Sequence, residues 1–258
     1  MSFTASRAVT SRLVFLEQAK STNDELAERV RAGSISDWPE FSVLVTDDQT
    51  AGRGRLGRTW SAPAGTMLAI SVLLRPARSG ILGAGATSWL PLVAGLAMTR
   101  GLAACGARAE LKWPNDVLVD DRKVCGILAE AHAGDTLIVG SGVNLTLTVD
   151  ELPVPTATSM LIVGAETDAD AVLSSYLKEF RDLYERFAAA GGDAEVSGLR
   201  AVVTEACSTL GREVRVQLPG QEDLTGIAEE LDGTGRLVVG ASGRRTAVSA
   251  GDVTHLRY

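Results

Sequence analysis

The chain has 258 residues, of which 45% are hydrophobic and 22% are charged, and its formal net charge is −7. This composition is typical of a globular protein with one large domain, or with one large and one small domain. The acidic balance argues against general nucleic-acid binding, which usually requires a basic face.

The sequence also argues against a membrane or secreted protein. No segment approaches the ~18 consecutive apolar residues of a membrane-spanning helix. The N-terminus lacks the apolar core of a signal peptide. The three cysteines, Cys105, Cys125 and Cys207, have neither metal-ligand spacing nor the even number of a disulfide framework. We therefore expect a cytoplasmic protein with no membrane partner.

The first part of the chain alternates apolar runs with polar turns. These runs predict strands at residues 13–16, 41–46 and 67–74, and helices at about 22–33 and 87–104. Thr22 and Glu25 have the spacing of a capping box at the start of the first helix. Gly33 suits the end of that helix, and Pro91 fits the first turn of the second.

The rest of the chain predicts a mixture of strands, helices and one long loop. The expected elements are a hairpin at 117–130, a strand at 136–145, a loop at 146–167, helices at 168–190 and near 195–210, and strands at 213–218, 224–228, 236–239 and 247–249. Apolar residues in 168–190 recur at intervals of three and four, so we expect them in the core. The last strands have the size of a small SH3-like β-barrel. We therefore predict domains at 1–210 and 211–258.

The most unusual segment is Gly52-Arg-Gly-Arg-Leu-Gly-Arg58, which Thr59 and Trp60 follow. We call Gly52–Arg58 the arginine loop. Its three arginines and three glycines combine guanidinium groups with a backbone that a ligand can approach closely. The arginine loop therefore predicts a site for a phosphate or a carboxylate.

The glycines of this loop match the dinucleotide pattern GxGxxG, but their context does not fit. That pattern requires a strand before the glycines and a helix that begins at them. Here the next regular element is the apolar strand expected at 67–74, and no acidic residue stands about 20 positions on to bind a ribose. A Walker phosphate loop also fails, because no Gly-Lys-Ser/Thr follows. The sequence therefore argues against a dinucleotide-binding fold.

Other polar residues lie on expected loops or strand ends of the first domain. They are Gln49, Lys112, Asn115, Asp116, Lys123 and Asn144. Each has an ordinary explanation when taken alone, such as a solvated charge or a turn. Ser21-Thr22-Asn23 likewise reads as a helix cap, although a helix N-terminus can also bind a polar ligand.

Taken together, these segments resemble one family, the biotin protein ligases. The matching segments are Ser21-Thr-Asn23, Gln49 to Trp60, Lys112-Trp-Pro-Asn-Asp116, Lys123-Val-Cys-Gly-Ile-Leu128, Gly142-Val-Asn-Leu145, Ala157-Thr-Ser-Met160 and Gly251-Asp-Val-Thr-His-Leu256. The resemblance runs in order from about residue 12 to the C-terminus. It implies an α+β fold, in which helices flank the mixed β-sheet of a class II synthetase-like catalytic domain and a small SH3-like barrel follows.

The resemblance implies a two-step, ATP-dependent ligation. Biotin and MgATP would give biotinyl-5′-AMP and pyrophosphate, and a lysine of a biotin carboxyl carrier domain of an acyl-CoA carboxylase would then take the biotinyl group and release AMP. Attack on a phosphate gathers negative charge, which suits the cations found here.

The resemblance also implies roles for the individual residues. Biotin contacts would come from Ser21, Thr22, Asn23, Gln49, Arg53, Gly54, Arg55 and Lys123. Nucleotide contacts would come from Arg53, Arg58, Trp60, Lys112, Asn115 and Asn144. The catalytic candidates are Lys123, Arg55 and Asp116. Asp116 would either bind Mg²⁺ or help to deprotonate the carrier lysine, and the sequence leaves both roles open.

Some members of this family carry an N-terminal DNA-binding domain and also act as repressors. The residues before the expected strand at 13–16 are too few for such a domain. We therefore expect a monofunctional ligase with no DNA partner.

Two alternatives compete with this interpretation. A lipoate–protein ligase would share the catalytic fold, but the arginine loop and the block Lys112–Asp116 are typical of biotin ligases. A non-catalytic module that binds nucleic-acid phosphates through the arginine loop would require a basic face, which the acidic composition does not favour.

Overall fold

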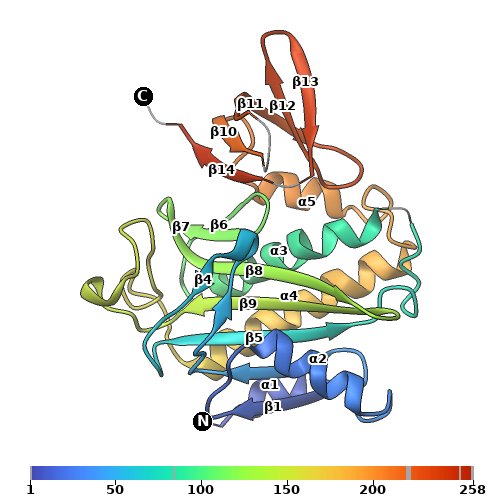
Figure 1. Ribbon diagram of the computed structural model, residues 1–258, viewed down its shortest axis with the longest axis vertical. Coiled ribbons are helices and arrows are strands. Elements are labelled where there is room, and N and C mark those ends of the chain that lie inside the picture. The colour runs from blue at the N-terminus through green and yellow to red at the C-terminus, as the bar shows by residue number, and fades with distance from the viewer. Residues whose placement is uncertain (1, 84, 219–221, 250, 257–258) are drawn as a thin grey trace.

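The structure of the chain is a computed structural model that describes residues 2–83, 85–218, 222–249 and 251–256. The described residues form a seven-stranded sheet, a five-stranded sheet and a two-stranded hairpin. Figure 1 shows the larger sheet in the body of the molecule, with helices around it, and the smaller sheet at one end. The predicted α+β class is confirmed. Within these ranges no helix is long and apolar enough to cross a membrane.

The seven-stranded sheet has the order β1-β2-β5-β9-β8-β7-β6. Its strands are β1 Arg12–Leu16, β2 Ser42–Thr46, β5 Met67–Leu74, β9 Thr136–Asn144, β8 Arg122–His132, β7 Asp116–Val119 and β6 Ala109–Lys112. Strands β1 and β2 pair in parallel, and all the other pairs are antiparallel. The strands expected at 13–16, 41–46 and 67–74, the hairpin at 117–130 and the strand at 136–145 are confirmed.

Helices cover both faces of this sheet, because successive side chains of a strand point to opposite faces and are buried on both. Val43 and Val45 of β2 pack in the main core with helices α3 (Leu90–Ala104) and α4 (Ala169–Ala189). Leu44, between them, packs in a second cluster with helix α2 (Thr22–Ala32). Figure 1 shows α3 and α4 together on the far side of the sheet. The near face, which carries α2, holds the candidate site described below.

The helix ends agree with the sequence predictions except at the start of α2. Ser21, and not Thr22, is the N-cap residue, because its hydroxyl accepts a hydrogen bond from the amide of Asp24 at 3.4 Å. The capping box predicted for Thr22 and Glu25 is therefore wrong by one position. Gly33 is the C-cap residue, and Pro91 lies in the first turn of α3, as predicted.

Helix α4 is the predicted core helix. Its apolar residues at intervals of three and four are all buried, as expected, namely Leu173, Leu177, Phe180, Leu183, Tyr184 and Phe187. Helix α4 packs closely on α3, where a Cβ placed on Gly101 would lie 2.8 Å from the backbone nitrogen of Tyr176.

Several short elements differ from the predictions. Helix α1 (Thr4–Ala8) and strand β6 were not predicted, and the helix expected near 195–210 is the shorter α5 (Leu199–Ala206). The long loop at 146–167 is confirmed apart from the 3₁₀ turn η3 (Val149–Glu151). The turn η2 (Ala86–Trp89) precedes α3. The arginine loop lies in a hairpin of β3 (Gly52–Arg53), η1 (Arg55–Gly57) and β4 (Thr59–Trp60).

The C-terminal part of the chain forms the antiparallel five-stranded sheet, with the order β13-β12-β11-β10-β14. Its strands are β10 Glu213–Gln217, β11 Leu224–Leu231, β12 Leu237–Ala241, β13 Arg244–Val248 and β14 Asp252–His255. This arrangement agrees with the predicted SH3-like domain. The sequence did not predict β14, which returns to pair with β10 and brings Asp252 towards the arginine loop.

Candidate functional site

A cavity of about 140 Å³ opens between helix α2, the arginine loop and the seven-stranded sheet. Small residues of β5, β8 and β9 form its floor, namely Ala69, Gly126, Gly140 and Gly142. Most of the residues predicted for ligand binding line it, namely Ser21, Thr22, Asn23, Gln49, Arg53, Gly54, Arg55, Arg58, Trp60, Asn115, Asp116 and Lys123. Lys112 and Asn144 are not among the lining residues. The fold thus gathers residues from six of the matching segments around one cavity.

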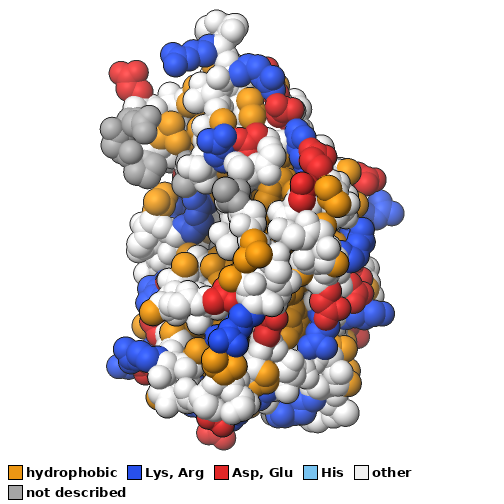
Figure 2. Space-filling view, turned by 90° about the vertical axis from the view of Figure 1, so that its right-hand side faces the viewer, with side chains coloured by type: hydrophobic (Ala, Val, Ile, Leu, Met, Phe, Trp, Pro, Cys, Tyr) orange, Lys and Arg blue, Asp and Glu red, His pale blue; other side chains and the backbone are white. Residues whose placement is uncertain are grey.

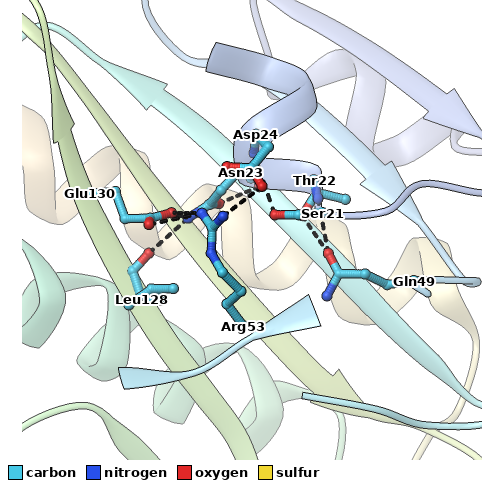
Figure 3. Close-up of polar contacts among 9 residues, drawn as sticks. Ser21, Thr22, Asn23, Asp24, Gln49, Arg53, Leu128 and Glu130 are labelled. Atoms are coloured by element: carbon cyan, nitrogen blue, oxygen red, sulfur yellow. Dashed lines mark hydrogen bonds and ion pairs between the residues drawn. The ribbon is translucent and has the colours of Figure 1, made fainter. Parts of the chain in front are cut away.

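Gln49 connects the entry of helix α2 to the arginine loop. Its Oε1 accepts hydrogen bonds from the backbone nitrogen of Thr22 at 2.9 Å and from the Thr22 hydroxyl at 3.2 Å. Figure 3 shows this pair beside Ser21. A Cβ placed on Gly52 would lie 2.3 Å from Nε2 of Gln49, so the loop can start here only with a glycine. The donors of the Gln49 amide therefore lie against the backbone of the arginine loop.

Asn23 uses its amide to hold helix α2 on the sheet. Its Nδ2 donates to the carbonyl of Leu128 at 3.3 Å and to Glu130 at 2.7 Å, and its Oδ1 accepts from the Ser71 hydroxyl at 2.6 Å. Figure 3 shows the side chain pointing from α2 to β8. A Cβ placed on Gly140 would lie 2.5 Å from Oδ1. Both amide protons of Asn23 are thus bound to protein acceptors, which points to a positioning role.

Arg53 closes one end of the cavity by pairing with two carboxylates. One guanidinium nitrogen lies 2.6 Å from Asp24 and the other lies 2.9 Å from Glu130. Figure 3 shows Arg53 reaching up from the loop between these two residues. The hydrogen bond that Arg53 donates to Asp24 raises the pKa of Arg53. Arg53 therefore lies beside Ser21 and Asn23, away from the other arginines of the loop.

Arg55 and Arg58 lie at the opposite end, where the C-terminal sheet meets the loop. Arg55 donates to Oδ1 of Asn115 at 3.0 Å and to the carbonyl of Gly251 at 3.4 Å. Burial lowers the pKa of the Arg55 guanidinium, and two nearby aspartates oppose this shift. Arg58 pairs with the carboxylate of Asp252 through both terminal nitrogens, one of them at 3.2 Å. Residues almost 200 positions apart thus meet at this end.

Lys123 and Asp116 form an ion pair inside the cavity. The Lys123 ammonium lies 2.5 Å from Asp116 and 5.7 Å from the centre of the Trp60 ring. Neighbouring Gly126 leaves room for it, since a Cβ there would lie 2.9 Å from Nζ. Lys112 of β6 faces Asp116 of β7 in register, and burial lowers the pKa of Lys112. Three cations therefore line this end of the cavity, two from the loop and Lys123 from the sheet, and Lys112 lies outside the lining beside Asp116.

Trp60 lies directly on the cavity floor. A Cβ placed on Gly142 would lie 2.5 Å from Cε2 of Trp60. The indole nitrogen of Trp60 is buried and has no hydrogen-bond partner among the described residues. The turn before it is tight, because Leu56 and Gly57 both have positive φ, at 56° and 72°. The hairpin thus places an aromatic ring next to the Lys123 ammonium.

Asn144 lies behind the cavity. It is 4% exposed, and its Nδ2 donates to the carbonyl of Thr158 at 2.8 Å. The amide of Thr158 in turn donates to the carbonyl of Lys123 at 2.8 Å. Asn144 therefore supports the strand that carries Lys123.

The sequence did not single out four residues that the structure brings to this site, namely Asp24, Glu130, Gly251 and Asp252. Asp24 and Glu130 stand within or beside motifs that were considered, but nothing in their spacing indicates that they share Arg53. Gly251 and Asp252 belong to a segment with a family resemblance, which was the only available signal for them.

The described residues contain no group of three or more His, Cys, Asp or Glu side chains that could hold a metal ion. Asp116 and Asp252 are the carboxylates that line the cavity, and each is engaged by a cation, Asp116 by Lys123 and Asp252 by Arg58. One or two carboxylates are compatible with Mg²⁺ when substrate phosphates complete the coordination.

Two family models match this chain. The biotin/lipoate A/B protein ligase family matches residues 15–144, and the biotin protein ligase C terminal domain matches residues 209–256. The chain belongs to the biotin/lipoate A/B protein ligase family.

Curated relatives match almost the whole chain. It is 39% identical to the biotin–[acetyl-CoA-carboxylase] ligase of Mycobacterium tuberculosis over 251 residues, which cover 95% of this chain and 90% of the relative. It is 33% identical to the enzyme of the same name from Paracoccus denitrificans, over 92% of this chain and 98% of the relative.

Solved structures of this family have the same fold. The biotin protein ligase from Aquifex aeolicus in complex with biotin and ATP superposes with a TM-score of 0.76 at 28% identity, over 96% of this chain and 100% of that chain. A mutant of the same ligase in complex with biotin gives a TM-score of 0.77 at 29% identity, over 96% of this chain and 99% of that one.

Proposed function

We propose that this chain is a biotin–[acetyl-CoA-carboxylase] ligase. It activates biotin with ATP to biotinyl-5′-AMP and pyrophosphate, and then transfers the biotinyl group to a lysine of a biotin carboxyl carrier domain. The observation that carries this proposal is the cavity, where three cations gather at one end and hydrogen-bonding side chains at the other. A carboxylate that reacts with a nucleotide phosphate requires both kinds of surface.

The first step needs cations at the reacting phosphate. A biotin carboxylate oxygen attacks the α-phosphorus of ATP, a new P–O bond forms, and the bond to pyrophosphate breaks. Lys123 and Arg55 lie where they can neutralise the charge that develops on the phosphate oxygens. Lys123 would exchange Asp116 for that phosphate.

The ring end of biotin fits the opposite side of the cavity. Its ureido group needs donors and acceptors, which Ser21, Thr22 and Gln49 present beside the α2 N-terminus. Arg53 and Gly54 line the same side. Asn23 serves this end by holding α2 in place, because its amide protons are already bound.

The nucleotide would occupy the end near the C-terminal sheet. Trp60 offers a ring for stacking, and Arg58 and Asn115 offer polar groups. Lys112 and Asn144 act from behind, through the field around Asp116 and through support of the Lys123 strand. Mg²⁺ would arrive with the ATP phosphates, and Asp116 is the residue that would bind it.

In the second step the carrier lysine attacks the acyl carbon, the bond to AMP breaks and the lysine loses a proton. Asp116 lines the cavity beside Lys123 and is the candidate acceptor for that proton. The carrier partner is a carboxylase subunit, and neither DNA nor a membrane is expected as a partner. The three free cysteines, all of them buried, support a cytoplasmic location. We place the domain boundary at residue 211.

A lipoate–protein ligase and a nucleic-acid-binding module are the alternatives. The family model covers ligases for both biotin and lipoate, whereas the relatives named above are biotin ligases. Figure 2 shows basic and acidic side chains interspersed on the face turned to the viewer, with no large basic patch. Such a face does not favour nucleic-acid binding.

The decisive experiment incubates the full chain with biotin, MgATP and a biotin carboxyl carrier domain and measures the mass of the carrier. We expect the mass to increase by one biotinyl group, and no increase with biotin would refute the proposal. Lipoate in place of biotin tests the alternative ligase in the same assay.

Two variants test the assignment of the cations. Lys123→Ala and Arg55→Ala should each slow biotin-dependent exchange of pyrophosphate into ATP by about 100-fold or more, the effect of removing one charge-stabilising group from a reacting centre. Lys178→Ala, an exposed lysine on α4, is the matched control and should exchange normally. Wild-type rates in both site variants would contradict the assignment.

A further inference from the structure

The arginine loop is held at both ends by carboxylates from other parts of the chain. Arg53 pairs with Asp24 and Glu130 of the first domain. Arg58, at the other end, pairs with Asp252, which lies 194 positions further along the chain. The second contact joins the loop to the C-terminal sheet.

We propose that Asp252 is a positioning residue of the ligation site: it holds the arginine loop across the cavity through Arg58, so that the reactive adenylate stays enclosed until transfer. The proposal rests on the function proposed above. It also gives the C-terminal sheet a specific task in the reaction.

Strand β14 presents Asp252 rigidly to the loop. Asp252 pairs in register with Gln217 of β10, and Val253 pairs with Val216. The chain enters β14 close to β10, because a Cβ placed on Gly251 would lie 2.6 Å from Cγ1 of Val216. Only a glycine fits there without displacing β10. The backbone pairing of β14 with β10 therefore fixes the position of the Asp252 carboxylate.

The geometry of the contact favours a defined closed position of the loop. The carboxylate of Asp252 receives both terminal nitrogens of Arg58, so the pair is bidentate. The neighbouring residue Gly251 accepts from Arg55 through its carbonyl. Two consecutive residues at the entry to β14 thus bind two arginines of the loop.

The surrounding charges keep Asp252 ionised. The hydrogen bond from Arg58 lowers the pKa of Asp252 against the opposing effect of partial burial, and Lys112 and Arg55 lower it further. The side chain of Asp252 is 34% exposed and that of Arg58 is 61% exposed. Because the pair is accessible to water, its effect should be modest, about twofold to fivefold in the equilibrium between closed and open loop.

The first experiment measures hydrogen exchange of the backbone amides of residues 52–58 in the full chain without added biotin or ATP. In Asp252→Asn, which keeps the shape and removes the charge, exchange in the loop should be about twofold to fivefold faster than in wild type. The matched control is Asp223→Asn, because Asp223 lies in the C-terminal part and pairs with Arg215 at 3.8 Å. This control should exchange like wild type in the loop.

A charge reversal separates a specific contact from a general effect on the fold. Asp252→Arg should open the loop further than Asp252→Asn, and the double variant Arg58→Asp with Asp252→Arg should restore slow exchange. Equal exchange in wild type and Asp252→Asn would overturn the proposal. Faster exchange throughout β10 and β11 as well as the loop would also overturn it, since Asp252 would then merely stabilise the C-terminal sheet.

The second experiment follows release of preformed, labelled biotinyl-adenylate during a chase with unlabelled biotin. Release from Asp252→Asn should be about twofold to fivefold faster than from wild type, and release at the wild-type rate would overturn the proposal. If wild type forms no adenylate, the proposed ligase function fails. The exchange experiment then still decides whether Asp252 holds the loop.

Discussion

Replacing Gly142 by alanine tests how closely the Trp60 ring packs on the cavity floor. The new Cβ would lie 2.5 Å from Cε2 of the indole ring and 2.8 Å from its Nε1 and Cζ2. Carbon atoms in contact normally lie about 3.5–4.0 Å apart. The ring must therefore move by about 1 Å, and with it the hairpin that carries the arginine loop.

Two opposing effects determine the stability of Gly142→Ala. Removing a glycine from a strand interior stabilises the fold by about 0.5–1 kcal/mol, because the unfolded chain loses freedom. Overpacking at a filled position costs about 1–3 kcal/mol. We expect a net loss of about 1–2 kcal/mol in the free energy of unfolding. Binding of biotin should weaken too, because Trp60 lies 5.7 Å from the Lys123 ammonium.

Urea denaturation and titration with biotin measure these two effects. Gly233→Ala is the matched control, since a Cβ at Gly233 meets nothing within 4 Å. Adding Trp60→Ala to Gly142→Ala should remove the collision, so the two changes should be non-additive by at least about 1 kcal/mol. Additive effects within about 0.3 kcal/mol, or a loss no larger than that of the control, would refute the reasoning.

Further predictions concern the helices behind the sheet. Gly101→Ala should destabilise by about 1–3 kcal/mol in urea despite a better helix propensity, because its Cβ would lie 2.8 Å from the Tyr176 backbone, which cannot rotate away. In Gly95→Ala the new Cβ would lie 2.5 Å from the end of the Leu111 side chain, and that side chain can move. The free energy of unfolding of this variant should therefore stay within about 1 kcal/mol of wild type. Equal losses in Gly101→Ala and Gly95→Ala would contradict this contrast. Tyr176→Phe should cost about 1–2 kcal/mol, because it leaves the buried Ser141 hydroxyl without its 3.0 Å partner, and unchanged stability would count against that bond.

The sequence predicted the strands of the large sheet other than β6, most easily where a strand is a continuous apolar run. Residues 67–74 are apolar except for one serine and are buried throughout β5, so their pattern had one interpretation. Strand β14 was missed because Asp252–His255 alternates only over four residues. A short strand of that kind is fixed by its pairing with β10, which sequence patterns do not contain.

The site was predictable where a motif holds the functional residues close together. The arginine loop, Lys123 and Asn115 fall around one cavity as expected. Lys112 and Asn144 were assigned to the nucleotide, yet neither lines the cavity, because Lys112 lies on the edge strand β6 beyond Asp116 and Asn144 is buried, and the sequence does not show these positions. The cap at Ser21 was misassigned for a similar reason, since two adjacent hydroxyl residues offer the same cap and only the backbone selects one.

The sequence did not predict which carboxylates pair with the cations of the site, and these pairs change how the arginine loop should be understood. Arg53, Arg58 and Lys123 each pair with an acidic residue of the same chain. Clustered cations repel one another, so the fold needs these partners to bring the cations together. A phosphate that enters the cavity must compete with carboxylates, and its gain in affinity is the difference between the two sets of contacts. This competition favours a ligand with several phosphate oxygens over a simple anion, because only such a ligand can replace several carboxylates at once.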